Sequence, residues 1–311
     1  MRVNRSAARL FHPVELADQV DLGRGLSARR RFTNRAMTVL ISVSFLLALA
    51  PLVSVLWETV SRGLTRIDVE FFTYSMRGIM GEGGGALHAI VGTLLITLAA
   101  VAIFVPLGVL AAIYLVEYGR GRAARVITFL VDVMSGIPSI VAGLFAYAVF
   151  SLILGPGVKL GIAGALSLAL LMTPIVVRST EEMLRLVPAE LREASLALGA
   201  PKWVTILRIV LPTSLAGIVT GVLLGISRII GETAPLLIAA GFTANMNLNL
   251  FADRMQSLPV YVYTQYSNQG NPAFAFVDRA WAAALTLVVI VLALNLLGRL
   301  IARRFGVRSK K

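Results

Sequence analysis

The feature that most constrains this chain is a recurring run of about 20 residues with few or no charged side chains. Each run is long enough to cross, as an α-helix, the roughly 30 Å hydrocarbon core of a bilayer. Only 14% of the residues are charged, whereas soluble domains average roughly 25%. We therefore expect an all-α integral membrane protein and not a soluble protein with a single core.

Six transmembrane helices are predicted. They cover residues 37–57, 90–116, 126–154, 160–177, 214–242 and 280–302. At a rise of about 1.5 Å per residue, each span is long enough to cross the membrane. The sequence Gly136-Ile137-Pro138-Ser139 interrupts the third span, and the turn Gly155-Pro156-Gly157 predicts a hairpin before the fourth.

The distribution of basic residues predicts the orientation. The segments 1–36, 117–125, 178–213 and 299–311 hold 22 Lys and Arg, whereas the intervening segments hold 6. Segments rich in Lys and Arg stay in the cytoplasm, so both termini are predicted there. The predicted organisation is a basic cytoplasmic segment 1–36, a transmembrane domain 37–302 and a basic cytoplasmic tail 303–311.

Several other classes of protein are not expected. The chain has no cysteine, which excludes disulfides and thiolate metal sites, and its two histidines, His12 and His88, are too few and too far apart for a metal site. The net charge of +13 lies in short segments between apolar runs, which argues against nucleic acid. No cleavable signal-peptide pattern is found.

Two flanking segments carry features of their own. Arg29-Arg30-Arg31 precedes the first span, and residues 1–36 are interpreted as a topology anchor with a partly disordered tail or as a helix on the inner membrane surface. The outer segment 245–279 is polar and turn-rich. Its Tyr261, Tyr263 and Tyr266 are placed at the membrane interface.

The inner segment 178–213 is too charged to span the membrane and too apolar for an idle linker. Pro188 suits the first turn of a helix, and Glu190 and Glu193 then lie near the positive end of its dipole. Gly199 can end that helix with a positive φ. We expect a short helix, a sharp turn and a second helix that re-enters the membrane.

The spacing in this segment resembles the EAA loop of ABC importer permeases, Glu-Ala-Ala-x3-Gly-x9-Ile-x-Leu-Pro. The matching residues are Glu193, Ala194, Ser195, Gly199, Ile209, Leu211 and Pro212. The resemblance implies a coupling helix that docks into a cytoplasmic ATPase subunit; the alternative is a surface helix that ties two spans together. No Walker A sequence occurs, so we expect a non-enzymatic subunit, without a cofactor of its own, whose ATP is used by a partner.

Ionisable residues inside predicted spans are costly, and they usually face a cavity or a partner. Arg228 and Glu232 are four residues apart and share one helix face. They form either a locally neutral ion pair or an arginine in a translocation pathway, where its planar fork suits a tetrahedral oxyanion. Asp132 lies too low in the third span to reach Arg228, and Arg178 is its expected partner.

The segments 83–95, 136–144, 173–184 and 227–237, together with the EAA loop, resemble the phosphate importer permease subunit of the PstA type. The resemblance implies a type I importer in the bacterial cytoplasmic membrane. Its expected partners are a second permease (PstC type), two copies of an ATPase subunit (PstB type) and an extracytoplasmic phosphate-binding protein (PstS type), with no nucleic acid.

The same resemblance implies that Arg178, Arg228 and Glu232 correspond to charged residues linked with phosphate passage; it assigns no role to Asp132. Three alternatives remain open. They are a permease for another oxyanion such as sulfate or molybdate, a membrane-embedded enzyme and a passive channel. The last two fit poorly, because no catalytic constellation is visible and a channel has no use for an EAA loop.

Overall fold

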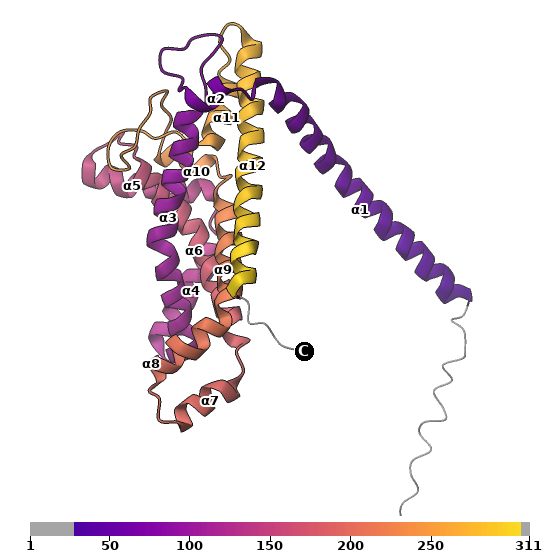
Figure 1. Cartoon of the computed structure of the whole chain (residues 1–311), viewed down its shortest axis with the longest axis vertical. Coiled ribbons are helices and arrows are strands. Elements are labelled where there is room, and N and C mark those ends of the chain that lie inside the picture. The colour runs from indigo at the N-terminus through magenta and orange to yellow at the C-terminus, as the bar shows by residue number, and fades with distance from the viewer. Residues whose placement is uncertain (1–27, 306–311) are drawn as a thin grey trace, which may run out of the picture. The chain divides into compact units, whose positions relative to one another are not determined.

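The computed structural model describes residues 28–305, and these form helices and connecting turns without a β-strand (Figure 1). The all-α prediction is confirmed. The chain divides into two units, Met1–Trp57 and Glu58–Lys311. The first unit contains most of the first helix, and the predicted tail preceding that helix lies outside the described residues.

The helices follow one another in a simple order. They are α1 (Ala28–Gly63), α2 (Val69–Thr73), α3 (Leu87–Ile113), α4 (Arg122–Ser135), α5 (Ser139–Leu154), α6 (Gly161–Arg185), α7 (Ala189–Ala197), α8 (Lys202–Thr205), α9 (Leu211–Ile229), α10 (Ala234–Ala239), α11 (Leu258–Ser267) and α12 (Ala273–Phe305). A 3-10 turn at Leu64–Arg66 follows α1, and π-helical turns at Tyr114–Tyr118 and Ile206–Val210 follow α3 and α8.

Five of the described helical segments are long and apolar enough to cross a membrane, and a sixth arises if α4 and α5 count as one bent span. The predicted third span, 126–154, consists of α4 and α5, which meet at 114°. The interruption predicted at residues 136–139 is therefore confirmed. The break at 136–138 has a physical cause. Pro138 has no N–H to continue the helical hydrogen bonds, and it disfavours the helical conformation of the residue before it.

The fifth span, predicted at roughly 214–242, differs from the structure in its bounds. Its helix begins earlier, because α8, the π-helical turn and α9 run on as one segment, Lys202–Ile229. It ends earlier too, at Ile229, and α10 begins only at Ala234. A π-helical turn shortly before Pro212 explains how proline is tolerated here, since the altered hydrogen bonding absorbs its missing N–H.

Helix α6 runs to Arg185, well beyond the predicted end of the fourth span at Val177. Residues 178–185 are therefore the last two turns of a spanning helix and not part of a loop. Thr180, Glu181 and Leu184 are buried there, so this end of α6 packs against its neighbours. The connecting segment between this helix and the next is accordingly shorter than the predicted 178–213.

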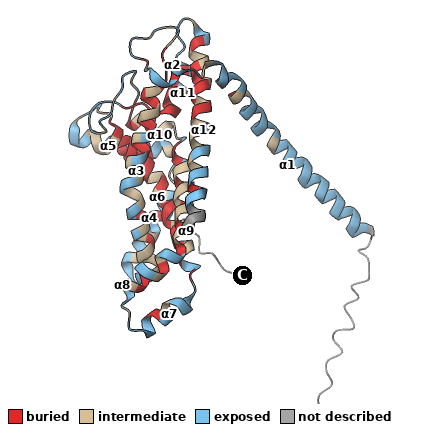
Figure 2. Ribbon diagram, viewed as in Figure 1, coloured by how far each residue is buried: buried red, intermediate tan, exposed pale blue. Residues whose placement is uncertain are grey.

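Helix α6 is the central element of the second unit, and Figure 2 shows buried residues concentrated along it and its neighbours. Its seam with α9 is made by three glycines on α9. A Cβ added at Gly217 would lie 2.1 Å from Met183 Sδ, one at Gly221 would lie 2.2 Å from Ser179 Oγ, and one at Gly225 would lie 3.1 Å from the Met172 side chain. Small residues that let two helix backbones approach are a common device of membrane helix packing.

The two ends of this unit differ in construction. Helices α7 and α8 lie at one end, and α2 and α11 lie at the other (Figure 1). At the α11 end Phe71, Leu258 and Tyr261 share one apolar cluster. The placement of Tyr261 at the membrane interface is therefore wrong, because the residue is fully buried, and burial raises the pKa of its hydroxyl. Tyr263 and Tyr266 are exposed.

Candidate functional site

The coupling segment predicted from the sequence folds as a short helix and a tight turn. Pro188 precedes α7 as its N-cap residue, one position earlier than predicted, and Glu190 lies in the first turn. The helix is followed by Gly199 with a φ of +81°. This left-handed conformation is easy for glycine and costs other residues roughly 1–2 kcal/mol. The predicted helix and glycine turn are confirmed.

Ser195 has a contact that its alanine counterpart in the EAA motif would lack. Its hydroxyl lies 2.9 Å from the hydroxyl of Thr205, and both side chains are buried. The hydrogen bond links α7 to α8 across the Gly199 turn. This hydrogen bond therefore fixes the orientation of α7 relative to α8.

Arg192 connects α7 to the ends of two spanning helices. Its Nε donates to Glu117 Oε1 at 3.0 Å, and its two terminal nitrogens donate to the carbonyls of Val187 and Leu184. The Glu117 side chain is only 7% exposed. Lys202 adds a second link, because its ammonium donates to the Glu117 carbonyl. The segment is thus braced to the C-terminal ends of α3 and α6.

Helix α7 is exposed over most of its surface, which carries both leucines and carboxylates. Leu191, Leu196 and Leu198 are exposed, as are Glu193 and Ala194 of the motif. The remaining motif residues lie where the π-helical turn passes into α9: Ile209 and Leu211 are half-buried, and Pro212 is exposed. An exposed helix that carries leucines and is anchored by Arg192 and Lys202 is an arrangement that suits a docking element.

Arg178 holds two carboxylates at once. It pairs with Asp132 of α4, and its Nη1 lies 2.9 Å from Glu181 Oε2 on its own helix. The prediction that Asp132 meets Arg178 is confirmed. We call Asp132, Arg178 and Glu181 the inner ion cluster. Its Arg178 lies seven residues before the end of α6, which is about 10 Å along the helix.

Arg228 and Glu232 form the predicted ion pair. The prediction that they share one helix face is wrong, because α9 ends at Ile229 and Glu232 lies in the break before α10. The Glu232 side chain is 11% exposed and that of Arg228 is 58% exposed. The guanidinium is therefore the accessible partner, and the carboxylate is held beneath it.

The α6–α9 seam sets the separation of the two arginines. Ser179 lies against Gly221, so the adjacent Arg178 is level with that point of α9. Arg228 follows Gly221 by seven residues, or two turns, which is about 10 Å along the helix. Two guanidinium groups thus stand at successive levels of one bundle, each already paired with a carboxylate.

A buried arginine that the sequence analysis missed organises the end opposite α7. Arg279 of α12 is fully buried; it donates to the carbonyls of Gly81 and Gly83 at 2.7 and 2.8 Å and to Gln265 at 3.0 Å. Among the described residues, no carboxylate lies within ion-pair distance of it. The side chain clamps the glycine-rich loop after α2 to α11.

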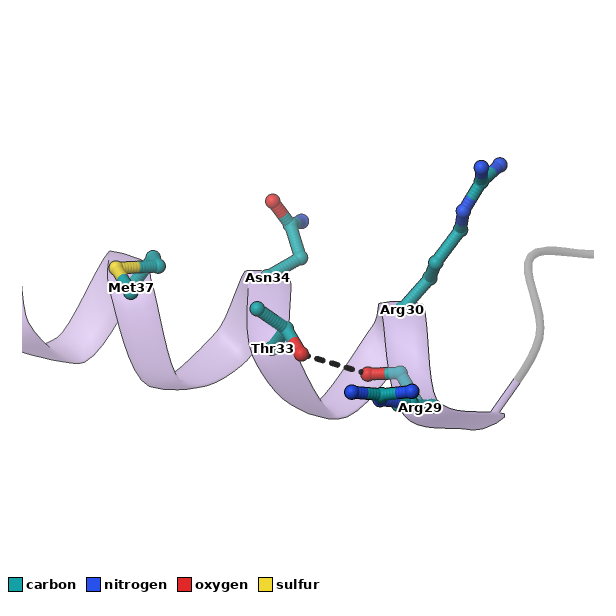
Figure 3. A pocket seen from close by; sticks show the side chains of 5 residues that line it. All are labelled: Arg29, Arg30, Thr33, Asn34 and Met37. Carbon is teal, nitrogen blue, oxygen red and sulfur yellow. Dashed lines mark hydrogen bonds between the residues drawn. The ribbon is translucent and has the colours of Figure 1, made fainter.

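The side of α1 bears a hollow lined by Arg29, Arg30, Thr33, Asn34 and Met37 (Figure 3). All five residues come from consecutive turns of one helix, and the Thr33 hydroxyl donates to the Arg29 carbonyl at 3.0 Å. A groove along a single helix does not bring separate elements together. It fits the predicted topology anchor better than a binding site.

Several residues of these sites escaped the sequence analysis: Glu117, Glu181, Arg192, Thr205 and Arg279. A charge close to the end of an apolar run was the available signal for Glu117 and Arg279. Their partners lie 75 and nearly 200 positions away in the chain. Spacing alone cannot find such contacts.

The family comparison covers two thirds of the chain. Residues 104–310 match the model of the family described as binding-protein-dependent transport system inner membrane component. The chain is 48% identical over 281 residues to phosphate transport system permease protein PstA 1 of Mycobacterium tuberculosis (strain CDC 1551 / Oshkosh), covering 89% of this chain and 91% of that protein. It is 41% identical to the PstA protein of Yersinia pestis over 282 residues, covering 88% and 91%.

Solved structures confirm the fold. A bacterial alginate ABC transporter chain matches with a TM-score of 0.59 at 15% identity, covering 90% of this chain and 96% of that one. A chain of the MetNI methionine ABC transporter matches with a TM-score of 0.54 at 21% identity, covering 71% and 94%. The chain therefore belongs to the binding-protein-dependent transport system inner membrane components, and within them to the PstA-type permeases.

Proposed function

We propose that this chain is the permease subunit through which an ATP-driven importer passes inorganic phosphate across the cytoplasmic membrane. Its relatives at 38–49% identity are named phosphate transport system permease proteins. Those names favour phosphate over sulfate or molybdate. The membrane enzyme and the passive channel do not account for the EAA segment.

The observation that carries the proposal is the pair of arginines at two levels of the α6–α9 bundle. Arg178 and Arg228 project from apolar helices, where an unpaired cation is costly. Their guanidinium forks can donate two parallel hydrogen bonds to a tetrahedral oxyanion. Each is paired with a carboxylate, Glu181 or Glu232, which orients the guanidinium in the absence of an anion. We assign both arginines and Glu232 to the substrate pathway.

The coupling role belongs to α7. We propose that its exposed surface docks into one of two ATPase subunits, and that the contact of Arg192 with Glu117 passes the motion of that subunit to α3 and α6. The coupling segment then moves as one rigid unit with the ATPase. Its motif residues are Glu193, Ala194, Ser195, Gly199, Ile209, Leu211 and Pro212. ATP is bound and hydrolysed by that partner, and we expect no cofactor on this chain.

This assignment places α7 and both termini in the cytoplasm. The α2 and α11 end then faces outward, where an extracytoplasmic phosphate-binding protein delivers the anion. A second permease subunit completes the pathway. In this organisation residues 37–302 form the permease domain between the basic segments 1–36 and 303–311.

Phosphate uptake tests the proposal directly. The four kinds of subunit are reconstituted in proteoliposomes, and uptake of labelled phosphate is measured with ATP inside. We expect uptake that needs both ATP and the binding protein and that excess sulfate or molybdate leaves unchanged. Uptake of sulfate in place of phosphate would contradict the assigned substrate, and uptake without ATP would contradict the importer.

A further inference from the structure

The inner ion cluster carries one more negative charge than positive charge. Arg178 contributes one positive charge, and Asp132 and Glu181 contribute two negative charges. A guanidinium that already holds two carboxylates presents no net positive charge to a third anion. In this arrangement Arg178 cannot bind an oxyanion until one carboxylate leaves.

The two carboxylates differ in their freedom to leave. Glu181 is 6% exposed and sits three residues from Arg178 on the same helix, so its departure would strand a buried charge. Asp132 is 60% exposed and reaches Arg178 from a different helix, α4. Only Asp132 can turn into open space without an uncompensated buried charge.

The end of α4 gives Asp132 room to move. Helix α4 stops at Ser135, three residues after Asp132, and the chain bends by 114° before α5. The neighbouring Val131 is buried in one apolar cluster with Val177 and Leu184 of α6, so α4 itself stays packed. Asp132 lies on the last turn of α4, and its exposed side chain can turn away from Arg178 by rotation about its own bonds.

We propose that Asp132 is an internal competitor of the transported anion for Arg178. In the resting transporter its carboxylate occupies the guanidinium and keeps cytoplasmic anions off it. During transport the oxyanion takes this place, and the return of Asp132 helps to release the anion into the cytoplasm. A pathway needs sites that bind weakly enough to let their ion leave. This inference rests on the proposed function, and it makes Asp132 a positioning residue.

Inhibition by internal phosphate tests the idea. Proteoliposomes with the complete transporter are loaded with increasing phosphate, and the internal concentration that halves uptake is measured. Asp132→Asn frees Arg178, so we expect half-inhibition at an internal concentration at least about threefold lower than in the wild type, a size typical of losing one partly exposed ion-pair partner. This concentration does not depend on how much transporter assembles.

Two variants serve as controls, and a third protects the test against misfolding. Asp132→Glu keeps the competing charge and should behave as the wild type. Glu58→Gln removes the carboxylate from the exposed Arg62 pair near the end of α1 and should also leave the concentration unchanged. Asp132→Ser repeats the loss of charge with a smaller side chain, should the asparagine variant fail to assemble.

Direct binding locates the effect. Equilibrium dialysis of labelled phosphate with the ATP-free transporter, without binding protein, should show tighter binding in Asp132→Asn than in the wild type, and this gain should be lost in Asp132→Asn with Arg178→Gln. Wild-type half-inhibition and binding in both Asp132→Asn and Asp132→Ser, or a gain in binding that survives the loss of Arg178, would overturn the inference. A wild-type transporter that takes up sulfate and no phosphate contradicts the proposed function instead, and internal sulfate then replaces phosphate in the same comparison.

Discussion

Arg192 and Glu117 are 75 residues apart in the chain, and their side chains meet at 3.0 Å where α7 approaches the end of α3. Glu117 is almost buried, and Arg192 also donates to two carbonyls at the end of α6. One side chain thus joins the coupling helix to two spanning helices. A rigid connection of this kind can transmit the motion of the proposed ATPase subunit to the spanning helices.

Arg192→Gln should uncouple the transporter. It leaves the Glu117 carboxylate nearly buried and unpaired, which we expect to lower the free energy of unfolding by about 2–4 kcal/mol. ATPase activity should persist while phosphate uptake per ATP falls severalfold. The measurement is uptake and ATP hydrolysis on the same proteoliposomes.

The matched variant Glu117→Gln with Arg192→Gln separates the two effects. It removes the stranded charge, so most of the stability should return. The coupling defect should remain, because the carbonyl contacts of Arg192 are also lost. Full recovery of uptake per ATP in the double variant would show that the brace serves stability alone.

Gly199→Asp and Glu193→Lys should reduce uptake without preventing membrane insertion. A side chain at Gly199 has open space around it, so the cost comes from its φ of +81° and amounts to roughly 1–2 kcal/mol. A reversed charge at Glu193 alters the exposed surface of α7. Co-purification of the ATPase subunit together with uptake is the measurement.

Gly78→Asp is the control for backbone strain. Gly78 has a φ of +74° and open space around it, and it lies after α2, outside the turn at Gly199. The substitution should strain the backbone through the same positive φ while ATPase binding is retained. Normal uptake in both Gly199→Asp and Glu193→Lys would remove the coupling assignment.

Arg228→Gln should abolish or strongly reduce phosphate uptake while the protein still accumulates in the membrane. The single variant leaves Glu232 unpaired at 11% exposure, so some loss of stability is expected as well. Arg228→Gln with Glu232→Gln is the sharper test, because no lone charge remains. We expect this double variant to be stable and still inactive, because the guanidinium fork is gone. Near-normal uptake per assembled transporter would place Arg228 outside the pathway.

Arg279→Met should loosen the end formed by α2 and α11. The substitution removes three charged hydrogen bonds, to Gly81, Gly83 and Gln265, and leaves buried acceptors unpaired. We expect the free energy of unfolding to fall by about 2–4 kcal/mol. The measurement is thermal unfolding of the purified protein in detergent. Arg77→Met is the control, because Arg77 is exposed in the loop after α2 that also contains Gly81 and Gly83. Equal midpoint temperatures of unfolding for Arg279→Met and Arg77→Met would contradict the proposal that Arg279 holds this end together.

Local physics made several features predictable from the sequence alone. Apolar runs identify spanning helices because the bilayer leaves no other way to satisfy the backbone. The turn at Gly199 and the pair of Arg228 with Glu232 involve residues a few positions apart, so short-range geometry is enough to place them. The match of Glu193 to Pro212 with the EAA motif is local in the same way.

The tertiary structure decided what depends on distant segments. The glycines of α9 set its register against α6, and this register places Arg178 two turns from the level of Arg228. The contacts of Arg192 with Glu117 and of Arg279 with Gly81 join segments that no spacing relates. The bend after Ser135 was visible as a glycine and a proline, but its angle of 114° depends on the packing of α4 against α6 and of α5 against α10 and α6. Hydropathy records how apolar a run is and carries no information about which of its faces meets which neighbour.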